Sequence, residues 1–335
     1  MNLEKTLLVF SAISLVCTAT HFLDEEWKIW KSKYGKTYSD EQEENIRRQI
    51  WEKIWDKVHN HNALAKKGLK NYTLAVNHFA DMIPEELSFK RGVKCPKANT
   101  QKASPLKAPK NSCMKNSNVP EEVDWRNSGC VTPVKNEGTY CAPSWAFAVV
   151  GHLETRYCLK HNELLSFSEQ QVVECDPGND GCCGGNPEGA FQYVNEHGLM
   201  LSKDYEYTDT TFSCLYKNKD AVNLNITKYY RLTQNEDNIS KAVAFDGPVA
   251  VSVHISKDFL LYDGGIFGND DECSEEILQS MVIIGYKSHC DTHYWLLKNS
   301  WGSEWGEDGF ARIDIKGSSC IKLIAAVAGD IGGPN

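Results

Sequence analysis

Two hydrophobic patterns divide the chain into a helical part and a strand-rich part. Ile50, Ile54 and Val58 recur every four residues, which predicts a long amphipathic helix. Beyond residue 248 the apolar residues instead form short β-rich runs bounded by Gly, Asn and Asp. These runs are Val249–Val253, Met281–Ile284, Tyr294–Leu297 and Phe310–Ile313. Helices followed by strands predict an α+β fold.

Capping signals set the expected helix boundaries. Ser39 with Gln42 forms a capping box before the long helix, and Gly68 is a plausible terminator. The later helices are expected at Ser144–Lys160, from Ser168 with Gln171 to Glu174, and from Asn186 and Pro187 to Gly198.

The N-terminus predicts entry into the secretory route. Lys5 precedes an apolar run from Leu7 to Val16, and small residues near Ala19 suit cleavage, so residues 1–19 read as a signal peptide. About ten apolar positions are too few for a transmembrane anchor, which needs about 20. Three glycosylation sequons fit this route: Asn71, Asn225 and Asn238.

Charge separates one segment from the rest of the 335-residue chain. Residues 88–118 hold eight Lys/Arg, no Asp/Glu and three prolines, which indicates an extended basic linker. With a whole-chain net charge of −9, the remainder carries −17. The linker is therefore either a strand docked on an acidic body or a solvated tether. The acidic balance argues against a nucleic-acid partner.

The stretch from Asn136 to Phe147 resembles the active-site loop and central helix of the papain family, in its cathepsin L-like branch. Relatives carry Asn-Gln-Gly, a disulfide cysteine and a nucleophilic cysteine directly before Trp-Ala-Phe. Here Ser144 precedes Trp145, Glu137 replaces the glutamine, and one residue is inserted after Gly138. The resemblance runs from Val119 nearly to the C-terminus.

Upstream, the chain resembles a cathepsin propeptide. Two motifs carry this resemblance: Glu44, Arg48, Trp51, Val58 and Asn62 on the long helix, with Ile54 as a departure, and the run Ala75–Asp81. An amphipathic helical hairpin without an inhibitory role is the alternative. The implied domains are an inhibitory propeptide at 20–87, the linker at 88–118 and a two-lobed papain-like domain at 119–335, with a helical lobe and an antiparallel barrel lobe meeting at a cleft.

The resemblance also implies disulfides. It pairs Cys141 with Cys182, Cys175 with Cys214, and Cys273 with Cys320. Loops of roughly 40 residues closed in this way each contribute about 3–4 kcal/mol in the chain-entropy model. The pairing of the remaining cysteines is left open: Cys95, Cys113, Cys130, Cys158, Cys183 and Cys290.

The residues at the family's catalytic positions predict an inactive site. Ser144 stands at the nucleophile position, and Ser280, within a segment resembling the one that carries the histidine, stands at the base position. A serine hydroxyl needs an adjacent base, and Ser280 is none. An ionised Glu137 would repel the developing oxyanion. Asn299 and Trp301 match the family's orienting amide and shielding ring, although Asn299 then has no imidazole to orient.

Other sites are weaker alternatives. Cys141 as a shifted nucleophile conflicts with its disulfide position, and His289 or His293 as a displaced base lies in a loop. A metal site at His289, Cys290 and His293 lacks the paired ligands of a zinc site, so we expect no metal and no cofactor. Gly184 and Gly185 are at positions where relatives bind substrate backbone, or serve only a tight turn.

These observations together predict a secreted or lysosomal papain-type homologue without peptidase activity. We expect a monomer, with no stable membrane anchor, that binds peptides or proteins in the former cleft. Active cysteine peptidases are a further class of expected partner. The alternatives are a residual peptidase or serine-based hydrolase of the same fold, and a propeptide that inhibits active relatives.

Overall fold

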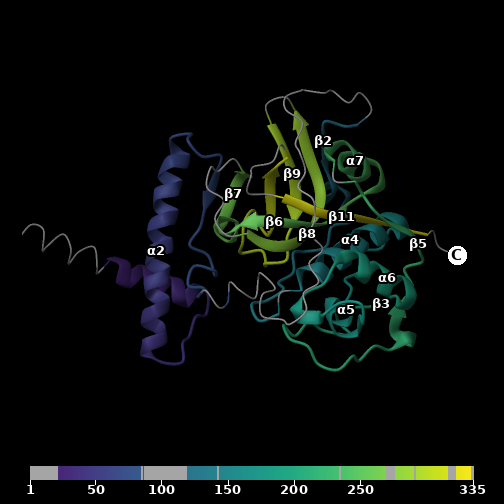
Figure 1. The fold of residues 1–335 in the computed structure, drawn as a ribbon, viewed down its shortest axis with the longest axis horizontal. Coiled ribbons are helices and arrows are strands. Elements are labelled where there is room, and N and C mark those ends of the chain that lie inside the picture. The colour runs from purple at the N-terminus through teal and green to yellow at the C-terminus, as the bar shows by residue number, and fades with distance from the viewer. Residues whose placement is uncertain are drawn as a thin grey trace, which may run out of the picture.

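A computed structural model shows a helical N-terminal part packed beside a larger body of helices and strands (Figure 1). The residues described are 22–83, 86, 119–141, 143–233, 235–268, 276–289, 292–315 and 322–332. The expected signal peptide and basic linker lie outside these residues, as do Cys95, Cys113, Cys273, Cys290 and Cys320.

The N-terminal part has an aromatic core of its own. Helix α2 (Glu41–Lys66) crosses a shorter helical segment at 22–33 (Figure 1). Trp27, Trp30 and Trp51 are at most 5% exposed, and the rings of Trp27 and Trp51 meet edge to face at 5.3 Å. The stripe predicted from the sequence therefore buries tryptophans rather than aliphatic residues alone.

The start of α2 corrects the sequence prediction by one residue. The N-cap is Asp40, whose carboxylate accepts the backbone N–H of Glu43 at 2.8 Å, and Glu43 reaches back to the N–H of Ser39 at 3.0 Å. The predicted pair of Ser39 with Gln42 is wrong, because a carboxylate caps equally well and also favours the positive end of the helix. Gly68, with φ +73°, ends the helix as predicted.

A short strand and one aromatic side chain join the two bodies. Strand β1 (Tyr72–Leu74) pairs antiparallel with β7 (Tyr262–Phe267) at the edge of the large sheet. Farther along, the ring of Phe79 lies edge-on to Trp301, with 5.2 Å between centroids. The N-terminal part thus extends the sheet and ends beside a tryptophan expected at the site.

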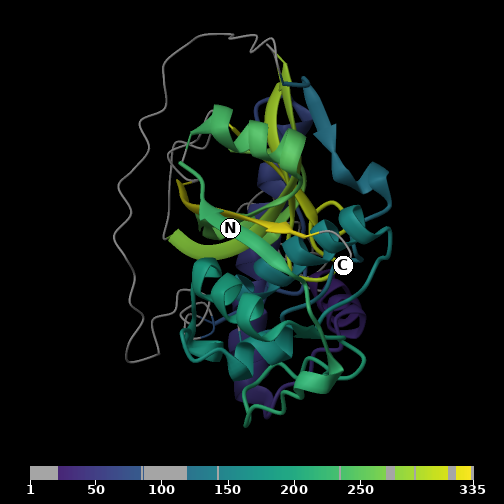
Figure 2. The same cartoon turned by 90° about the vertical axis from the view of Figure 1, so that its right-hand side faces the viewer.

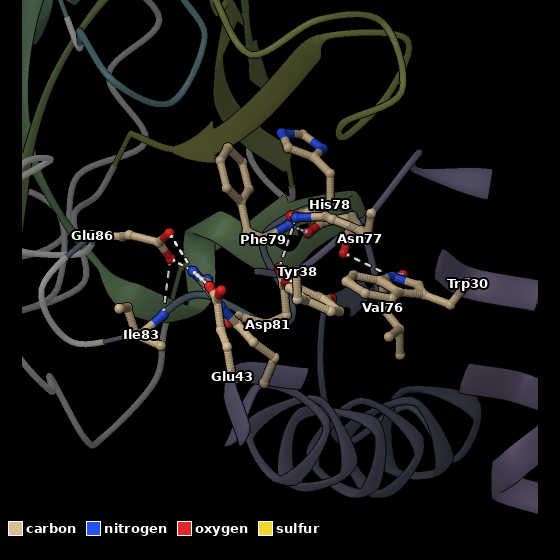
Figure 3. A network of polar contacts seen from close by, with 12 residues as sticks. Trp30, Tyr38, Glu43, Val76, Asn77, His78, Phe79, Asp81, Ile83 and Glu86 are labelled. Atoms are coloured by element: carbon tan, nitrogen blue, oxygen red, sulfur yellow. Dashed lines mark hydrogen bonds and ion pairs between the residues drawn. The ribbon is translucent and has the colours of Figure 1, made fainter. Parts of the chain in front are cut away.

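Asp81 fixes the segment that carries Phe79. Its carboxylate is 1% exposed and accepts hydrogen bonds from Lys36 Nζ at 2.7 Å and Tyr38 Oη at 3.0 Å (Figure 3). Burial, with the Asp81 charge beside it, raises the pKa of the Tyr38 phenol well above its usual value. Arg47 holds Glu86 with two hydrogen bonds, of 2.7 and 3.0 Å. The segment is therefore held by charge-assisted bonds on its helix side.

The helical lobe has the predicted helices. They are α4 (Ser144–His161), α5 (Glu169–Cys175) and α6 (Pro187–His197). The side chains of Ser168 and Asn186 cap α5 and α6 by accepting the N–H groups of Gln171 at 3.0 Å and Gly189 at 2.9 Å. Figure 2 shows this teal helical part below the green and yellow strands.

The second lobe is one largely antiparallel sheet. Its strand order is β1-β7-β10-β9-β8-β6-β11-β5, β2 also pairs with β8, and only β7 with β10 is parallel among these pairs. The strands not yet given are β2 (Glu122–Asp124), β5 (Ile226–Arg231), β6 (Val249–Ser256), β8 (Glu276–His289), β9 (Thr292–Lys298), β10 (Phe310–Asp314) and β11 (Lys322–Ile331). All four predicted β-rich runs lie within these strands.

Strand β8 separates two hydrophobic cores. Val282 and Ile284 belong to the core shared with α4, whereas Met281 and Ile283 belong to the core that contains Trp301. This division follows from the alternation of side chains along a strand. The face on which a residue of β8 lies therefore decides which lobe its side chain meets.

Three disulfides lie among the described residues. Cys141–Cys182 and Cys175–Cys214 confirm two predicted pairs. Cys130–Cys158, which the sequence left open, joins the segment before the active-site loop to the last turn of α4. Cys183 is disulfide-bonded as well.

Candidate active site

Ser144 lies at the N-terminus of α4, where a papain-type nucleophile is expected. It is 7% exposed, and its Oγ accepts a hydrogen bond from the backbone N–H of Ser280 at 3.1 Å. Pro143, at the N-cap, makes no side-chain cap. A hydroxyl that accepts a backbone N–H and has no base beside it stays protonated, because its intrinsic acidity is low.

The side chain of Ser280 does not enter the site. Its Oγ is 2.8 Å from Ser252 Oγ on the neighbouring strand β6, and both side chains are buried. The hydrogen bond to Ser144 comes from the backbone N–H of Ser280. The expectation that the Ser280 hydroxyl stands beside Asn299 is wrong, because its side chain lies on the opposite face of β8.

Gln279 is the residue that faces Asn299. Its Nε2 donates to Asn299 Oδ1 at 3.1 Å, to Glu137 Oε2 at 3.3 Å and, more weakly, to Ser300 Oγ at 3.4 Å. Gln279 is 1% exposed. Gln279 therefore occupies the position at which Asn299 would orient a base. Its amide has no useful proton affinity near neutral pH.

Sequence reasoning missed Gln279 because a five-residue resemblance fixed the register of β8 only to within one residue. A shift by one moves every side chain to the opposite face. The available signal was the alternation itself: Gln279 shares the odd-numbered positions of β8 with Met281 and Ile283, which face Trp301.

Glu137 is enclosed by neutral donors. It is fully buried, and its carboxylate accepts Ser300 Oγ at 2.5 Å and Trp301 Nε1 at 3.0 Å, besides Gln279. Tyr207 Oη donates to the Glu137 carbonyl at 2.8 Å, and burial, with Asp209 and Glu137 nearby, raises the pKa of that phenol. The cage presents a hydrogen-bond acceptor where a tetrahedral oxyanion would need donors.

Asn299 keeps its place but not its role. Its Oδ1 accepts from Gln279 and from the N–H of Ser300 at 2.9 Å, while its Nδ2, buried, has no hydrogen-bond partner within the described part of the chain. An unsatisfied buried donor costs about 1–3 kcal/mol. Asn299, the counterpart of the family's orienting amide, is thus retained, but it faces the amide of Gln279 instead of an imidazole.

The enlarged loop before α4 is held by Asp209. The Asp209 carboxylate accepts the N–H groups of Thr139 at 3.0 Å, Tyr140 at 3.3 Å and Cys141 at 2.9 Å. Gly138, with φ +72°, has no room for a Cβ beside that carboxylate. The inserted residue is therefore absorbed on the surface, with Tyr140 82% exposed, and Ser144 still begins the helix.

The predicted binding glycines line the wall next to Trp145. A Cβ on Gly185 would lie 2.6 Å from the Trp145 ring and from Asn179 Oδ1, so only glycine fits there. Gly184, with φ +123°, makes the turn that precedes it. The ring of Trp301 is 1% exposed and packs on Phe79 rather than on an imidazole.

A buried ionic cluster lies behind the site. Lys135 Nζ is 2.6 Å from both Glu154 Oε1 and Glu169 Oε1, and Lys298 donates to Thr132 at 2.6 Å. Burial raises the pKa of Glu169 to about 7 despite Lys135, and burial lowers the pKa of Lys298. A cavity of about 20 Å³ among these residues and Asn299 has room for roughly one water.

The remaining predicted positions lie away from this network. His289 and His293 belong to the far end of the β8–β9 hairpin, where Ser288 pairs with His293, so neither is a base for Ser144. No cluster of metal-ligating side chains occurs within the described residues, and no helix there is long and apolar enough to cross a membrane. The side chains at Asn71, Asn225 and Asn238 are exposed.

Comparison with known proteins gives the same two-part division. The model of papain family cysteine proteases matches residues 119–328, and that of the cathepsin propeptide inhibitor domain (I29) matches residues 27–87. The chain is 36% identical to a cathepsin L-like proteinase of Fasciola hepatica (87% of this chain, 88% of that one) and 34% identical to cathepsin K of Mus musculus (91% and 92%).

Solved proforms share the fold. Digestive procathepsin L 3 of Tenebrio molitor larval midgut is similar with a TM-score of 0.78 at 32% identity, covering 92% of this chain and 99% of that one. A recombinant stem bromelain precursor is similar with a TM-score of 0.77 at 29% identity, covering 93% and 99%.

Proposed function

Because the chain belongs to the papain family of cysteine proteases and carries a cathepsin-type propeptide, we propose that it is a catalytically inactive member that binds peptides or proteins in its former cleft. The single observation that supports this most is the position of Gln279. Its amide takes the place opposite Asn299 and binds Glu137, so the position at which Asn299 would orient a base holds a group that cannot accept and return a proton near neutral pH.

Three changes act together against hydrolysis. Ser144 lacks a base, Gln279 cannot serve as one, and Glu137 offers a carboxylate to a developing oxyanion. Loss of nucleophile and base costs on the order of 10⁶ in rate in a comparable constellation. Loss of an oxyanion donor alone costs about 2.7–4 kcal/mol of barrier.

A binding role is favoured by the structural features of the former active site that the chain retains. Gly185 still passes Trp145 in close contact, the Cys141–Cys182 bridge still closes the wall, and the loop insertion is anchored by Asp209. Side chains held this firmly around the former active site suit contact with an extended peptide or a protein loop. The disulfides fit an oxidising compartment, so we place the protein in the secretory route, secreted or lysosomal.

The test restores the missing chemistry. The full-length chain with Glu137→Gln, Ser144→Cys and Gln279→His is acidified and assayed for self-cleavage within residues 88–118 and for turnover of a fluorogenic peptide. We expect activity in this triple variant and none in the natural chain. The matched control replaces Gln279→His with Ser280→His and should remain inactive, since that side chain lies on the other face of β8.

Two outcomes contradict the proposal. Hydrolysis by the natural chain that Ser144→Ala abolishes would show a working serine-based site. An inactive triple variant would show that the cleft itself is deformed.

The propeptide offers a second candidate function, inhibition of active relatives. It is favoured by its own aromatic core and by the way β1 and Phe79 engage the sheet and Trp301. The measurement is inhibition of an active cathepsin L-type peptidase by the full chain before and after cleavage of the basic linker. Equal and negligible inhibition in all states would exclude it.

A further inference from the structure

The buried ionic cluster behind the candidate active site borders a small cavity with a partly polar lining. The cavity has a volume of about 20 Å³, and its lining includes Lys135, Glu154, Glu169, Lys298 and Asn299. A polar cavity of this size has room for about one water-sized particle. We propose that it is a binding site for one small monovalent anion of the chloride class, held by Lys298 and Asn299.

Two buried donors in the lining have hydrogen-bonding capacity left. Lys298 is 6% exposed, and its one hydrogen bond to a described residue goes to Thr132 Oγ1 at 2.6 Å. An ammonium carries three N–H donors, so two of them remain. Asn299 is 3% exposed, and its Nδ2 has no partner within the described part of the chain. A monatomic anion only accepts hydrogen bonds, so it matches two neighbouring donors.

The carboxylates of the cluster are engaged by other groups. Glu154 Oε1 accepts from Lys135 Nζ at 2.6 Å, and Glu154 Oε2 accepts from Thr132 Oγ1 at 2.5 Å. Glu169 Oε1 accepts from the same Lys135 ammonium at 2.6 Å. Among the described residues, Lys298 is therefore the charged member of the cluster without an ion pair. A buried cation in this position gains from a counter-ion.

The charge balance of the cluster favours an anion in acid. Lys135 and Lys298 oppose Glu154 and Glu169, while the raised pKa of Tyr207, the phenol near Glu169, keeps that group neutral. Burial raises the pKa of Glu169 to about 7, so this carboxyl loses its charge in acid. Burial also lowers the pKa of Lys298, and a bound anion would favour its protonated form. Anion uptake is therefore linked to proton uptake, and the affinity should rise as the pH falls.

The size of the cavity selects among anions. A volume of about 20 Å³ admits a monatomic ion such as chloride or bromide, and it is too small for gluconate or sulfate. The remaining lining is largely apolar and includes Phe147, Met281 and Val282. The site should therefore discriminate by size between salts of equal charge.

A bound anion would connect the candidate active site to the helical lobe. Asn299 and Ser300 line the cavity from the side of the site, whereas Glu154 of α4 and Glu169 of α5 line it from the other side. Filling the cavity should therefore stabilise the junction between the end of β9 and the two helices. The proposal uses only groups behind the site, so it does not depend on whether the former cleft binds peptides.

The test is thermal unfolding of the full-length chain in sodium chloride and in sodium gluconate of equal ionic strength, at about pH 5 and about pH 8. We expect chloride to raise the unfolding midpoint saturably in acid, by about 2–4 °C, and by less than half as much in base. Lys298→Met should abolish the difference between the two salts. The matched control is Lys203→Met at an exposed lysine, which should keep it.

A bromide-soaked crystal grown in acid gives a readout that does not depend on how a variant folds. We expect an anomalous peak within hydrogen-bond distance of Lys298 Nζ and Asn299 Nδ2. Equal midpoints in the two salts in acid, or a chloride effect that survives in Lys298→Met, would overturn the proposal. So would a water in the cavity with no bromide. A bromide peak without chloride-dependent stabilisation would be an adventitious ion only and would count against it equally.

Discussion

The side-chain amide of Gln279 lies between Asn299 and Glu137, 3.1 Å from Asn299 Oδ1 and 3.3 Å from Glu137 Oε2. One neutral donor thus binds both an amide oxygen and a buried carboxylate. In an active relative these positions would form a catalytic dyad and an oxyanion donor. Here Gln279 links two acceptors within one hydrogen-bonded network, so the stability of the site depends on its amide.

Gln279→Glu should therefore destabilise the protein more strongly near pH 7 than in acid. A second carboxylate beside Glu137 replaces an attraction by a repulsion, and we expect a loss of about 3–5 kcal/mol in the free energy of unfolding. The loss should shrink as the pH falls, since one of two adjacent carboxyls then protonates. Denaturant unfolding at several pH values measures it.

The control for this substitution is Gln192→Glu on the exposed face of α6, which should stay within about 0.5 kcal/mol. A Gln279→Glu protein as stable as the parent at pH 7 would contradict the expected repulsion between the new carboxylate and that of Glu137.

His152 should make the fold sensitive to acid. Burial lowers the pKa of this imidazole to about 3, and its Nε2 accepts the N–H of Gly329 at 3.1 Å. The unfolded chain, with a pKa near 6.5, binds the proton more readily than the folded chain. The contribution is therefore complete above pH 6.5 and is lost as the pH falls toward 3, with a loss of roughly 3 kcal/mol by pH 4.5.

Comparing the pH dependence of unfolding of the parent and of His152→Gln isolates this term. The variant is expected to lose stability less steeply between pH 6.5 and 4. Parallel curves for the two proteins would refute the assignment.

Asp209→Ala should release the enlarged loop before α4. Three backbone N–H groups lose their acceptor, and amide exchange at residues 139–141 should accelerate at least tenfold, with a loss of about 1–3 kcal/mol in unfolding free energy. Asp204→Asn, on an exposed position of the same segment, is the control. Unchanged exchange at all three amides would mean that the loop is held by other contacts.

The additional bridge between Cys130 and Cys158 should stabilise the helical lobe. Its 28-residue separation gives about 3.6 kcal/mol in the chain-entropy model. The Cys130→Ser, Cys158→Ser double variant should lose much of this in thermal or denaturant unfolding. A loss under about 1 kcal/mol would indicate that the reduced chain already keeps this loop closed.

Local signals predicted much of the architecture. Caps and periodicity identified α2, α4, α5 and α6, and the β-rich runs identified four strands, because each signal acts within a few residues. Asp40 and Ser39 are both good N-cap residues. Helix α2 begins after Asp40, because its carboxylate is the stronger hydrogen-bond acceptor. The Cys130–Cys158 bridge could not be found, because it depends on how α4 ends beside a distant segment.

The site was predictable in its parts but not in its contacts. The sequence assigned Ser144 and Asn299 from a tryptophan close by in each motif, Trp145 and Trp301. The assignment of the base position to Ser280 instead of Gln279 shows the limit. Adjacent residues of a strand point to opposite faces of the sheet, and the pairing of β8 with β6 decides which of the two meets the catalytic positions.

The strand β1 also has a consequence for how the larger body would behave alone. It supplies partners to the outer edge of β7, with Ile266 donating to the Asn71 carbonyl at 2.9 Å and Ala75 to the Leu261 carbonyl at 2.7 Å. Without β1, the outer edge of β7 would expose unpaired peptide groups, and the ring of Phe267 would lose its contact with Tyr72. Such an edge favours self-association of the separated domain. Production of the 119–335 region by itself should therefore give aggregates at concentrations where the intact chain remains dispersed.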